Sequence, residues 1–239
     1  MIDLSEFGRK YPYKTELHAH TKPVSSCSHI SAEELVGIYS GYGCHSVVIT
    51  NHLHGKRWAE GDPFARAEEY LEDYRVAKEA GKKSGLNVLL GVEIRFTAEN
   101  INDYLIYGVS EEDIPRFIGY LDGDIERFYK ECKTEKNLIL QAHPFRDKMM
   151  PPKLDCIDGI ETFNLHPSHN SRVGYAARYA AENRLFVSGG TDFHEEPHKA
   201  MCLARTAERL TDSFDVARIL KSRDYFLDIS GNYIFVSQE

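Results

Sequence analysis

The chain has 239 residues, of which 42% are hydrophobic and 28% charged, and its formal net charge is −8. This length and composition suit a globular protein with one larger α/β core, so we expect a single domain over residues 1–239. The negative charge argues against a nucleic-acid polymer or an anionic membrane as the main partner. A small anionic substrate remains compatible, because bound metal ions reverse the local field.

The cysteines are odd in number, scattered along the chain and without a CxxC pair. They are Cys27, Cys44, Cys132, Cys156 and Cys202. This pattern indicates reduced thiols and predicts a cytoplasmic location. Residues 1–6 show no basic region followed by an apolar run, so we expect no signal peptide. No apolar stretch approaches the ~18 residues of a membrane span.

In chain order, hydrophobic patterning predicts short apolar strands that alternate with helices. The expected strands cover residues 15–20, 46–50, 87–94, 104–107, 138–141, 159–162, 186–188, 225–229 and 233–236. The expected helices cover residues 31–42, 62–84, 112–121, 125–135, 172–182 and 214–222, and residues 53–61 are expected to form a loop. About seven strands of this kind, joined by helices, predict a parallel sheet closed or wound by βα units.

Two of these helices carry clear boundary signals. Ser31, followed by Glu34, has the pattern of a capping box. Asp62 before Pro63 is a typical helix start, with proline at the first helical position. Gly85 is the expected stop of that second helix.

One segment near the start of the chain pairs two histidines in a short predicted strand. His18 and His20 are separated by one residue, so the pleat places them on the same side with Cβ atoms about 6.5 to 7 Å apart. Two imidazoles at that separation can converge on one metal ion, at about 2.0–2.1 Å each. The segment therefore predicts a metal site.

Further metal-ligating side chains recur at predicted strand ends, the edge at which a βα-barrel assembles its active site. They are His52, Glu93, Asp103, His143, Asp192 and His194. Histidines mixed with carboxylates suit Zn, Mn or Fe, and the set holds too many nitrogens for a calcium site. Glu93 is the carboxylate that we expect to bridge two metal ions, because it offers two oxygens near the middle of the set.

The order of these motifs resembles the PHP family (polymerase and histidinol phosphatase domain). The matching segments, spread over about residues 15–195, are His18-Ala19-His20-Thr21, Thr50-Asn51-His52, Gly91-Val92-Glu93, His143-Pro144, Gly159-Ile160-Glu161-Thr162-Phe163-Asn164 and Asp192-Phe193-His194. The resemblance implies a distorted (β/α)7 TIM-like barrel with two or three divalent metal ions (Zn, Mn or Fe) and hydrolysis of phosphoesters.

The resemblance also implies how the ligands divide. The first metal ion would be held by His18, His20, Glu93 and Asp192, the second by Glu93 and His143, and the third by His52 and His194. Glu93, Asp192 and His194 are the residues expected to carry catalysis.

Three positions depart from the family pattern. Asn51 replaces the usual Asp, which removes a charge next to His52. The extra ligand of the third metal ion falls in residues 24–29, where Cys27 or His29 could serve. Asp103 stands where many members have a His, so the second metal ion would gain an oxygen ligand, which favours Mn or Fe.

Other polar residues have supporting roles in this interpretation. Glu161 is expected to orient a ligating histidine through its free N–H. Arg95 and Arg146 directly follow strand-end ligands and are candidates to bind a substrate phosphate. His166 and His169 are candidates to line the pocket. Solvated loop positions are expected for His45, His54 and His198.

These features together predict a phosphomonoesterase that uses a metal-activated water. The expected substrate is a small metabolite ester, either histidinol-phosphate-like or a nucleotide. Two alternatives stay open: an amidohydrolase-type metal hydrolase and a non-catalytic PHP module. The former class commonly has a carbamylated Lys where this chain has Glu93. The substrate itself, the metal identity and the oligomeric state do not follow from the sequence.

Overall fold

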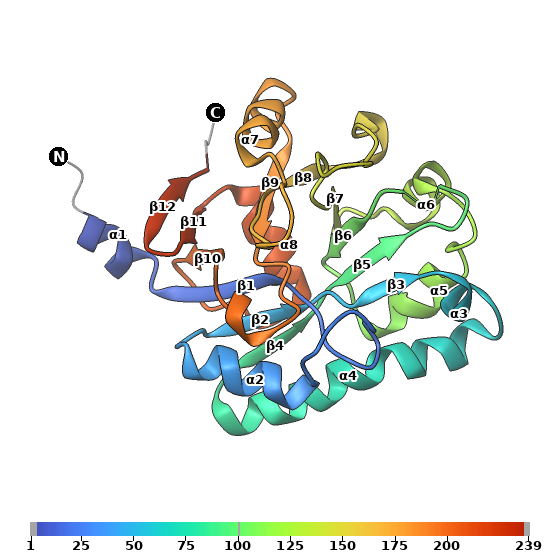
Figure 1. Ribbon diagram of the computed structural model, residues 1–239, viewed down its shortest axis with the longest axis horizontal. Coiled ribbons are helices and arrows are strands. Elements are labelled where there is room, and N and C mark those ends of the chain that lie inside the picture. Colours follow the sequence, from blue (N-terminus) through green and yellow to red (C-terminus); the bar gives the residue numbers. More distant parts are fainter. Residues whose placement is uncertain (1–3, 100, 237–239) are drawn as a thin grey trace.

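The computed structural model describes residues 4–99 and 101–236 and shows a mixed α/β fold with two six-stranded sheets (Figure 1). The first sheet has the order β12-β11-β10-β1-β2-β4, and the second has the order β3-β5-β6-β7-β8-β9. The strands are β1 (Tyr13–Ala19), β2 (Ser46–Ile49), β3 (His52–His54), β4 (Asn87–Leu90), β5 (Val92–Arg95), β6 (Tyr104–Tyr107), β7 (Leu138–Gln141), β8 (Gly159–Asn164), β9 (Phe186–Gly190), β10 (Leu203–Thr206), β11 (Tyr225–Ile229) and β12 (Asn232–Phe235).

The helices lie outside the sheets, with α2 and α4 side by side beneath β1, β2 and β4 in Figure 1. They are α1 (Leu4–Lys10), α2 (Ala32–Gly41), α3 (Lys56–Ala59), α4 (Pro63–Ser84), α5 (Ile114–Ile118), α6 (Ile125–Cys132), α7 (Val173–Glu182) and α8 (Ser213–Ser222), with short 3₁₀ helices at Glu111–Asp113, Leu154–Cys156 and Glu196–His198. No helix among the described residues is both long enough and apolar enough to cross a membrane.

The boundary signals of α2 and α4 are confirmed. Ser31 and Glu34 form the reciprocal capping box at the start of α2. The Asp62 side chain accepts a hydrogen bond from Ala65 N at the start of α4, and Gly85 ends that helix in a left-handed conformation. These boundaries depend on residues three or four apart, which explains why local sequence predicts them well.

The two sheets are joined by strands that continue from one into the other. β2 runs on into β3 and β4 into β5, and Gly91 lies at the second break, where a Cβ atom would approach Val48 Cγ1 to 2.8 Å. At the other junction, Phe193 N donates to His18 O and His20 N donates to Phe193 O. Gly190 permits that approach, because a Cβ there would lie 2.5 Å from His18 Cβ. Strand ends from both sheets therefore meet around one place.

The expected wholly parallel arrangement is wrong for part of the molecule. β6 pairs antiparallel with both β5 and β7, and β10 to β12 form an antiparallel series beside β1. Only residues 96–103 link β5 to β6, too few for the crossover that a parallel pair needs. The reversal brings Asp103, at the start of β6, to the edge where the neighbouring strands end.

Other expected boundaries also need correction. The strand expected over 87–94 is divided at Gly91 into β4 and β5. The expected loop 53–61 contains most of β3 and the short helix α3, which buried Trp58 anchors. α1 and β10 also have no counterpart in the sequence prediction. β10 is interrupted by Arg205, a buried residue whose Nε donates to Tyr11 O, so its sequence lacks the continuous apolar run of a buried strand.

The apolar core lies away from the carboxyl edge of the strands, and polar residues occupy that edge. One buried cluster includes Leu35 of α2 and Leu71 of α4, and a second includes Leu17 of β1 and Leu220 of α8. Ser213, at the start of α8, accepts hydrogen bonds from the backbone that follows β6. α8 thus lies at the end of β6 opposite Asp103.

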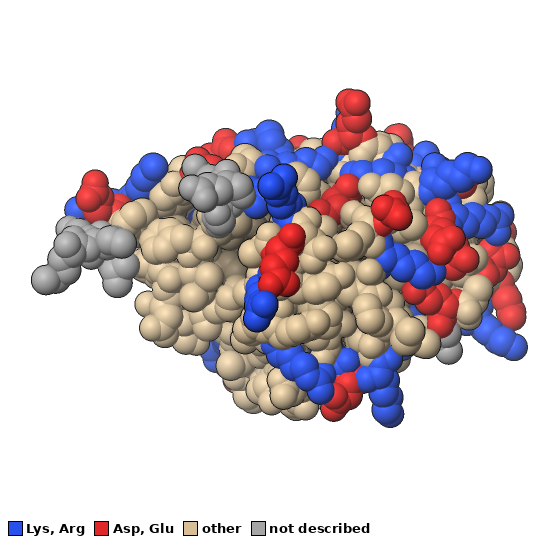
Figure 2. Space-filling view, turned by 90° about the horizontal axis from the view of Figure 1, so that it is seen from above, with Lys and Arg blue, Asp and Glu red and all other residues tan. Residues whose placement is uncertain are grey.

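The charged side chains on the face shown in Figure 2 are of both signs and intermingle. This distribution accompanies a chain with 29 basic and 37 acidic residues. Polymeric anions bind best to a continuous basic surface. The face in Figure 2 shows charges of both signs, and the expectation that no nucleic acid binds stays a prediction of the sequence.

Candidate metal centre

The predicted metal ligands all come together at the carboxyl edge of the strands. Six of them are almost fully buried, with 3% or less of the residue exposed, namely His18, His20, Glu93, Asp103, His143 and Asp192. His52 and His194 border the pocket, with 17% and 15% of their side chains exposed. Burying this many titratable groups is costly unless they are paired or hold an ion.

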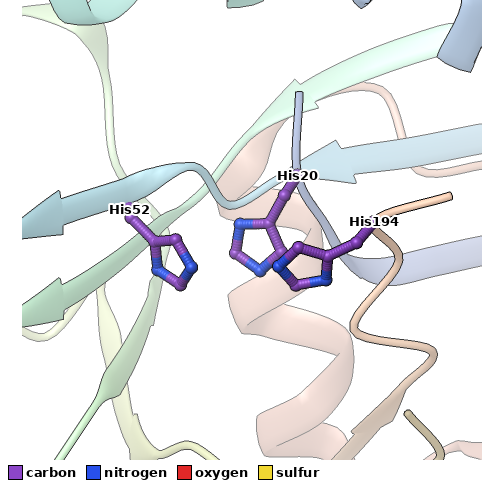
Figure 3. Close-up of side chains that lie close together, drawn as sticks. All are labelled: His20, His52 and His194. Atoms are coloured by element: carbon purple, nitrogen blue, oxygen red, sulfur yellow. The ribbon is translucent and has the colours of Figure 1, made fainter. Parts of the chain in front are cut away.

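Three groups of these residues are spaced to hold a metal ion. They are His18, His20 and Asp192; Glu93, Asp103 and His143; and His20, His52 and His194. Within each group, one candidate ligand atom from every residue lies within 4.8 Å of the others. The imidazole rings of the third group face one another across a short gap (Figure 3).

Glu93, a member of the second group, also approaches histidines of the other two and presents each carboxylate oxygen to a different pair of histidines. Its Oε1 is 3.5 Å from His18 Nε2 and 3.1 Å from His143 Nε2. Its Oε2 is 3.4 Å from His20 Nε2 and 2.8 Å from His52 Nδ1. This is the arrangement that a bridging carboxylate requires.

Several polar atoms of the centre are buried without a hydrogen bond among the described residues. They are His18 Nε2, His52 Nδ1, His143 Nδ1 and Glu93 Oε2. Buried polar atoms are almost always paired, so this group of orphans indicates a missing partner. The imidazole and carboxylate donors fit a divalent cation such as Zn, Mn or Fe.

The charges of the centre also favour a cation. Burial opposes ionisation of Glu93, but the positive charges of His52 and His18 outweigh it and hold its pKa well below the usual range. Burial likewise opposes charging of His18, yet Glu161, Asp192 and Glu93 raise its pKa well above the ordinary value. The low pKa of Glu93 and the high pKa of His18 have one cause, the close approach of opposite charges in a buried site, and such a concentration of carboxylates favours a bound cation.

Glu161 connects two of the candidate ligands from behind. Its Oε1 lies 2.8 Å from His18 Nδ1, which leaves Nε2 directed toward Glu93. Its Oε2 accepts hydrogen bonds from His143 N at 3.0 Å and from Asn164 Nδ2 at 2.9 Å. The structure thus places Glu161 where the sequence prediction expects it, against the free nitrogen of a ligating histidine.

A second supporting carboxylate, Glu16, was missed by sequence analysis. Its Oε1 accepts from the backbone N–H groups of His18 and Thr191, at 3.0 and 2.9 Å, and its Oε2 accepts from Tyr39 at 2.8 Å. Burial raises its pKa to about 7. Glu16 ties β1 to the segment that carries Asp192. An acidic residue two positions before His18, in a buried strand, was the available signal.

Asn51 and Asp73 of α4 belong to a third hydrogen-bond network that supports the candidate ligands. Asn51 Oδ1 accepts from Thr21 N and Ser25 Oγ, and Asn51 Nδ2 donates to Thr21 Oγ1 and, at 3.5 Å, to Asp73 Oδ2. Ser25 Oγ in turn accepts from His52 N. The charge that this chain lacks at position 51 is thus present at Asp73, which sequence analysis did not single out.

The two candidate phosphate-binding arginines each pair with a candidate ligand. Arg95 donates twice to Asp103, from Nε at 2.7 Å and from Nη2 at 2.5 Å. Arg146 Nη2 donates at 2.5 Å to Asp192 Oδ2 and to Asn164 Oδ1. Both arginines line the pocket, so phosphate binding stays a prediction for them. Their present contacts orient the aspartates and offset their charge.

Backbone strain marks two of the candidate ligands. His143 and Asp192 have φ angles of 30° and 57°, in the left-handed region that few residues other than glycine adopt. Such conformations cost about 1–3 kcal/mol and persist where the surroundings impose them, often at functional sites. Here the strain accompanies side chains that turn into the centre.

The centre opens into a pocket of about 560 Å³. Its lining is mostly polar and includes His166, Ser168, His169 and Asn170, so the two histidines lie where the sequence prediction places them. Of the remaining histidines, His45 packs on Tyr13, His54 lies beside His52, and His198 pairs with Glu195.

The two candidates for the extra ligand of the third group lie in one loop. Cys27 lines the pocket together with His52 and His194. Burial raises the pKa of its thiol, but the influence of these two imidazoles prevails and lowers the pKa to about 6. His29 lines the pocket with an exposed side chain, and its backbone N–H donates to His194 O at 2.9 Å.

Comparison with solved structures gives several proteins of the same fold at low identity. A two-domain protein from Bacteroides vulgatus that contains a predicted PHP-like metal-dependent phosphoesterase matches at 16% identity and a TM-score of 0.61, over 90% of this chain and 64% of that one. PsfC from Pseudomonas syringae matches at 15% identity and a TM-score of 0.61, over 95% and 93% of the two chains. The chain thus has a PHP-like fold. It spans less than two thirds of the length of the two-domain protein, of which 64% is covered.

A third structure supports the same fold. A protein from Bifidobacterium adolescentis, proposed to be a metal-dependent phosphoesterase, matches at 18% identity and a TM-score of 0.50, over 87% of this chain and 95% of that one. Sequence-family models and curated proteins give no match. The resemblance deduced from the motifs is thus confirmed as a likeness of fold, and the activity has to be argued from the site.

Proposed function

We propose that this protein is a metal-dependent phosphoesterase, most specifically a phosphomonoesterase for a small phosphorylated metabolite. The observation that carries the proposal is the position of Glu93, whose two oxygens face different pairs of buried histidines below a polar pocket. A carboxylate so placed suits a centre of two or more cations that binds phosphate oxygens.

The three spatial groups divide the ligands among the cations. The first ion would be held by His18, His20 and Asp192, the second by Asp103 and His143, and the third by His52 and His194, with Glu93 shared between the first two. Two or three divalent ions of Zn, Mn or Fe fit these donors. When bound, such ions supply Lewis acidity that activates water and offsets negative charge on the phosphate.

The chain's own residues then position the reactants. In the proposed hydrolysis an oxygen of water forms a bond to phosphorus, the ester P–O bond breaks, and the alcohol leaves with a proton. Glu93 and Asp192, both buried and with pKa values well below the usual range, would hold the cations. His194 borders the pocket, where its ring can contact the ester. The barrier falls mainly through orientation and electrostatics, because no protein nucleophile is required.

The substrate class follows from the shape and lining of the pocket. A pocket of about 560 Å³ with histidine, serine and asparagine on its wall suits a small polar ester such as a nucleotide or a histidinol-phosphate-like metabolite. The amidohydrolase alternative has less support, since Glu93 occupies the place of the bridging lysine that the sequence analysis associates with that class. We interpret the two sheets as an opened form of the predicted distorted barrel.

The cellular setting is part of the same proposal. Five free thiols suit a reducing compartment, and we propose the cytoplasm. A single domain over residues 1–239 and a small phosphorylated partner stay predictions of the sequence analysis.

The decisive experiment is release of inorganic phosphate from a panel of phosphomonoesters by the metal-free protein reloaded with Zn, Mn or Fe. The panel holds histidinol phosphate, nucleoside monophosphates, sugar phosphates and phosphotyrosine. We expect turnover of at least one member and its loss with a chelator. Bound metal without turnover of any member would contradict the phosphomonoesterase and favour diesters, amides or a non-catalytic module.

A further inference from the structure

His166 lies between the inner and the outer part of the pocket. The centroid of its ring is 5.4 Å from that of His194, a candidate ligand, and 4.7 Å from that of His169, on the outer wall. All three residues line the pocket. In the proposed function, on which this inference rests, phosphate binds beside the candidate ligands and the alcohol portion of the substrate extends outward. The ester oxygen that joins the two portions then lies at the level of His166.

One hydrogen bond determines which nitrogen of the His166 ring carries the proton. The backbone N–H of Ser168 donates to His166 Nδ1 at 3.2 Å. A ring nitrogen that accepts a hydrogen bond carries no proton, so the imidazole is neutral and its proton is on Nε2. The loop thus occupies Nδ1, and Nε2–H remains as the donor that His166 offers to a molecule in the pocket.

The backbone of His166 is tied to the candidate metal centre. His166 N donates to Asn164 Oδ1 at 3.2 Å. Asn164 Nδ2 in turn donates to Glu161 Oε2 at 2.9 Å and to Asp192 Oδ2 at 3.3 Å. On the outer side, His166 O accepts from His169 N at 3.1 Å. A donor held in this way needs little reorganisation when charge develops beside it, which is the condition for electrostatic catalysis.

We propose that His166 is a catalytic residue whose Nε2–H donates a hydrogen bond to the ester oxygen of the substrate. As the oxygen of water bonds to phosphorus, the P–O bond to the alcohol breaks and its electron pair moves to this ester oxygen. The hydrogen bond stabilises the negative charge that develops there. The attacking water supplies the proton that the alcohol finally carries, so His166 is neutral before and after the step. The benefit is largest for esters of aliphatic alcohols, whose anions are the least stable.

The test compares His166→Ala and His166→Gln with the parent on two esters, with each protein loaded with the same divalent metal. One substrate is the best aliphatic ester of the panel, and the other is para-nitrophenyl phosphate, whose leaving group is stable as an anion. His169→Ala is the matched control, because it removes an imidazole from the same loop. kcat is measured separately for each ester.

We expect His166→Ala to lower kcat for the aliphatic ester by about 10- to 100-fold, the range of one hydrogen bond to a charged group. For para-nitrophenyl phosphate kcat should change by less than about 3-fold, since a stable anion gains little from the donor. His166→Gln should recover most of the rate on the aliphatic ester, because its amide can donate in place of Nε2–H. His169→Ala should affect both esters alike.

A second measurement requires no turnover. Long-range nitrogen–proton NMR correlations of the histidine rings report which ring nitrogen carries the proton, and those of His166 are assigned by their loss in His166→Gln. We expect the proton of the neutral ring on Nε2. A proton on Nδ1 would overturn the inference, even if the protein hydrolyses phosphoesters.

The kinetic outcomes separate this inference from the proposed function. Equal losses of kcat on both esters in His166→Ala would contradict the inference, because a distorted pocket does not distinguish leaving groups. An unchanged kcat on the aliphatic ester would also contradict it. In both cases the parent still releases phosphate, so the proposed function stands. A parent that hydrolyses neither ester would contradict the proposed function and this inference together.

Discussion

The buried floor of the candidate centre, formed by His18, His20, Glu93, Asp103, His143 and Asp192, and its rim, formed by His52 and His194, are held in place by different kinds of contact. On the floor, His18 is fixed by Glu161 behind it and faces Glu93 and Asp192 in front. On the rim, His52 and His194 border the pocket and depend on a loop fastened by Ser25 and Ser28. Several long-range contacts fix the positions of the floor side chains, whereas the positions of the rim side chains depend on a few hydrogen bonds.

This contrast explains where the chain departs from the PHP pattern. The departures at positions 27 and 51 belong to the loop or its support, which can exchange one donor for another. The departure at position 103 is on the floor, and there a partner accompanies it, since Arg95 donates twice to Asp103. A buried charge is tolerated only with such a partner. Substitutions on the floor should therefore have the larger effects.

Glu93→Gln should have the largest effect. The amide cannot present two anionic oxygens to four histidines, so we expect loss of metal and phosphate release that falls to background. Metal analysis and the ester panel measure both quantities. Exposed Glu112→Gln is the matched control and should behave as the parent. Full activity with normal metal stoichiometry in Glu93→Gln would refute the bridging role.

Glu161→Gln tests the support behind the floor. Its oxygens hold His18 and the backbone of His143, and loss of such an orienting partner typically reduces metal affinity or activity by about 10- to 100-fold. Competition with a chelator measures the affinity. A variant with unchanged affinity would mean that the packing of His18 alone maintains its orientation.

Asn51→Asp tests the support beneath the rim. It would direct a carboxylate oxygen at Asp73 Oδ2, where the amide now donates at 3.5 Å. We expect a loss of about 1–3 kcal/mol in the free energy of unfolding. This loss corresponds to about 2–4 °C in Tm for each kcal/mol. The double variant Asn51→Asp with Asp73→Asn should recover most of it. Equal thermal stability of parent and Asn51→Asp would contradict the network.

His169→Ala should have the smallest effect, because its ring lines the outer pocket and lies 4.7 Å from that of His166. We expect a KM about 2- to 10-fold higher with kcat unchanged, the range of one modest hydrogen bond. Steady-state kinetics on the preferred ester measures both constants. His45→Ala, at the far end of β2, serves as the control. A fall in kcat instead would place His169 among the catalytic residues.

Sequence by itself determined the local features of this protein. The capping box of α2 and the limits of α4 followed from neighbouring residues. Seven of the eight candidate ligands, all but Asp103, were expected at one edge because they lie at or after the end of a predicted strand. These features depend on hydrogen bonds across a few residues or on the period of the pleat, so the amino-acid order contains them directly.

Only the tertiary structure decided what surrounds those ligands. Glu16 links β1 to Thr191, Asp73 reaches Thr21 and Asn51 from α4, and the antiparallel direction of β6 brings Asp103 to the site. Each feature joins residues distant along the chain or depends on strand direction, for which no short motif exists. Buried polar groups need partners wherever the fold places them, so the partners of this centre became visible only with the fold.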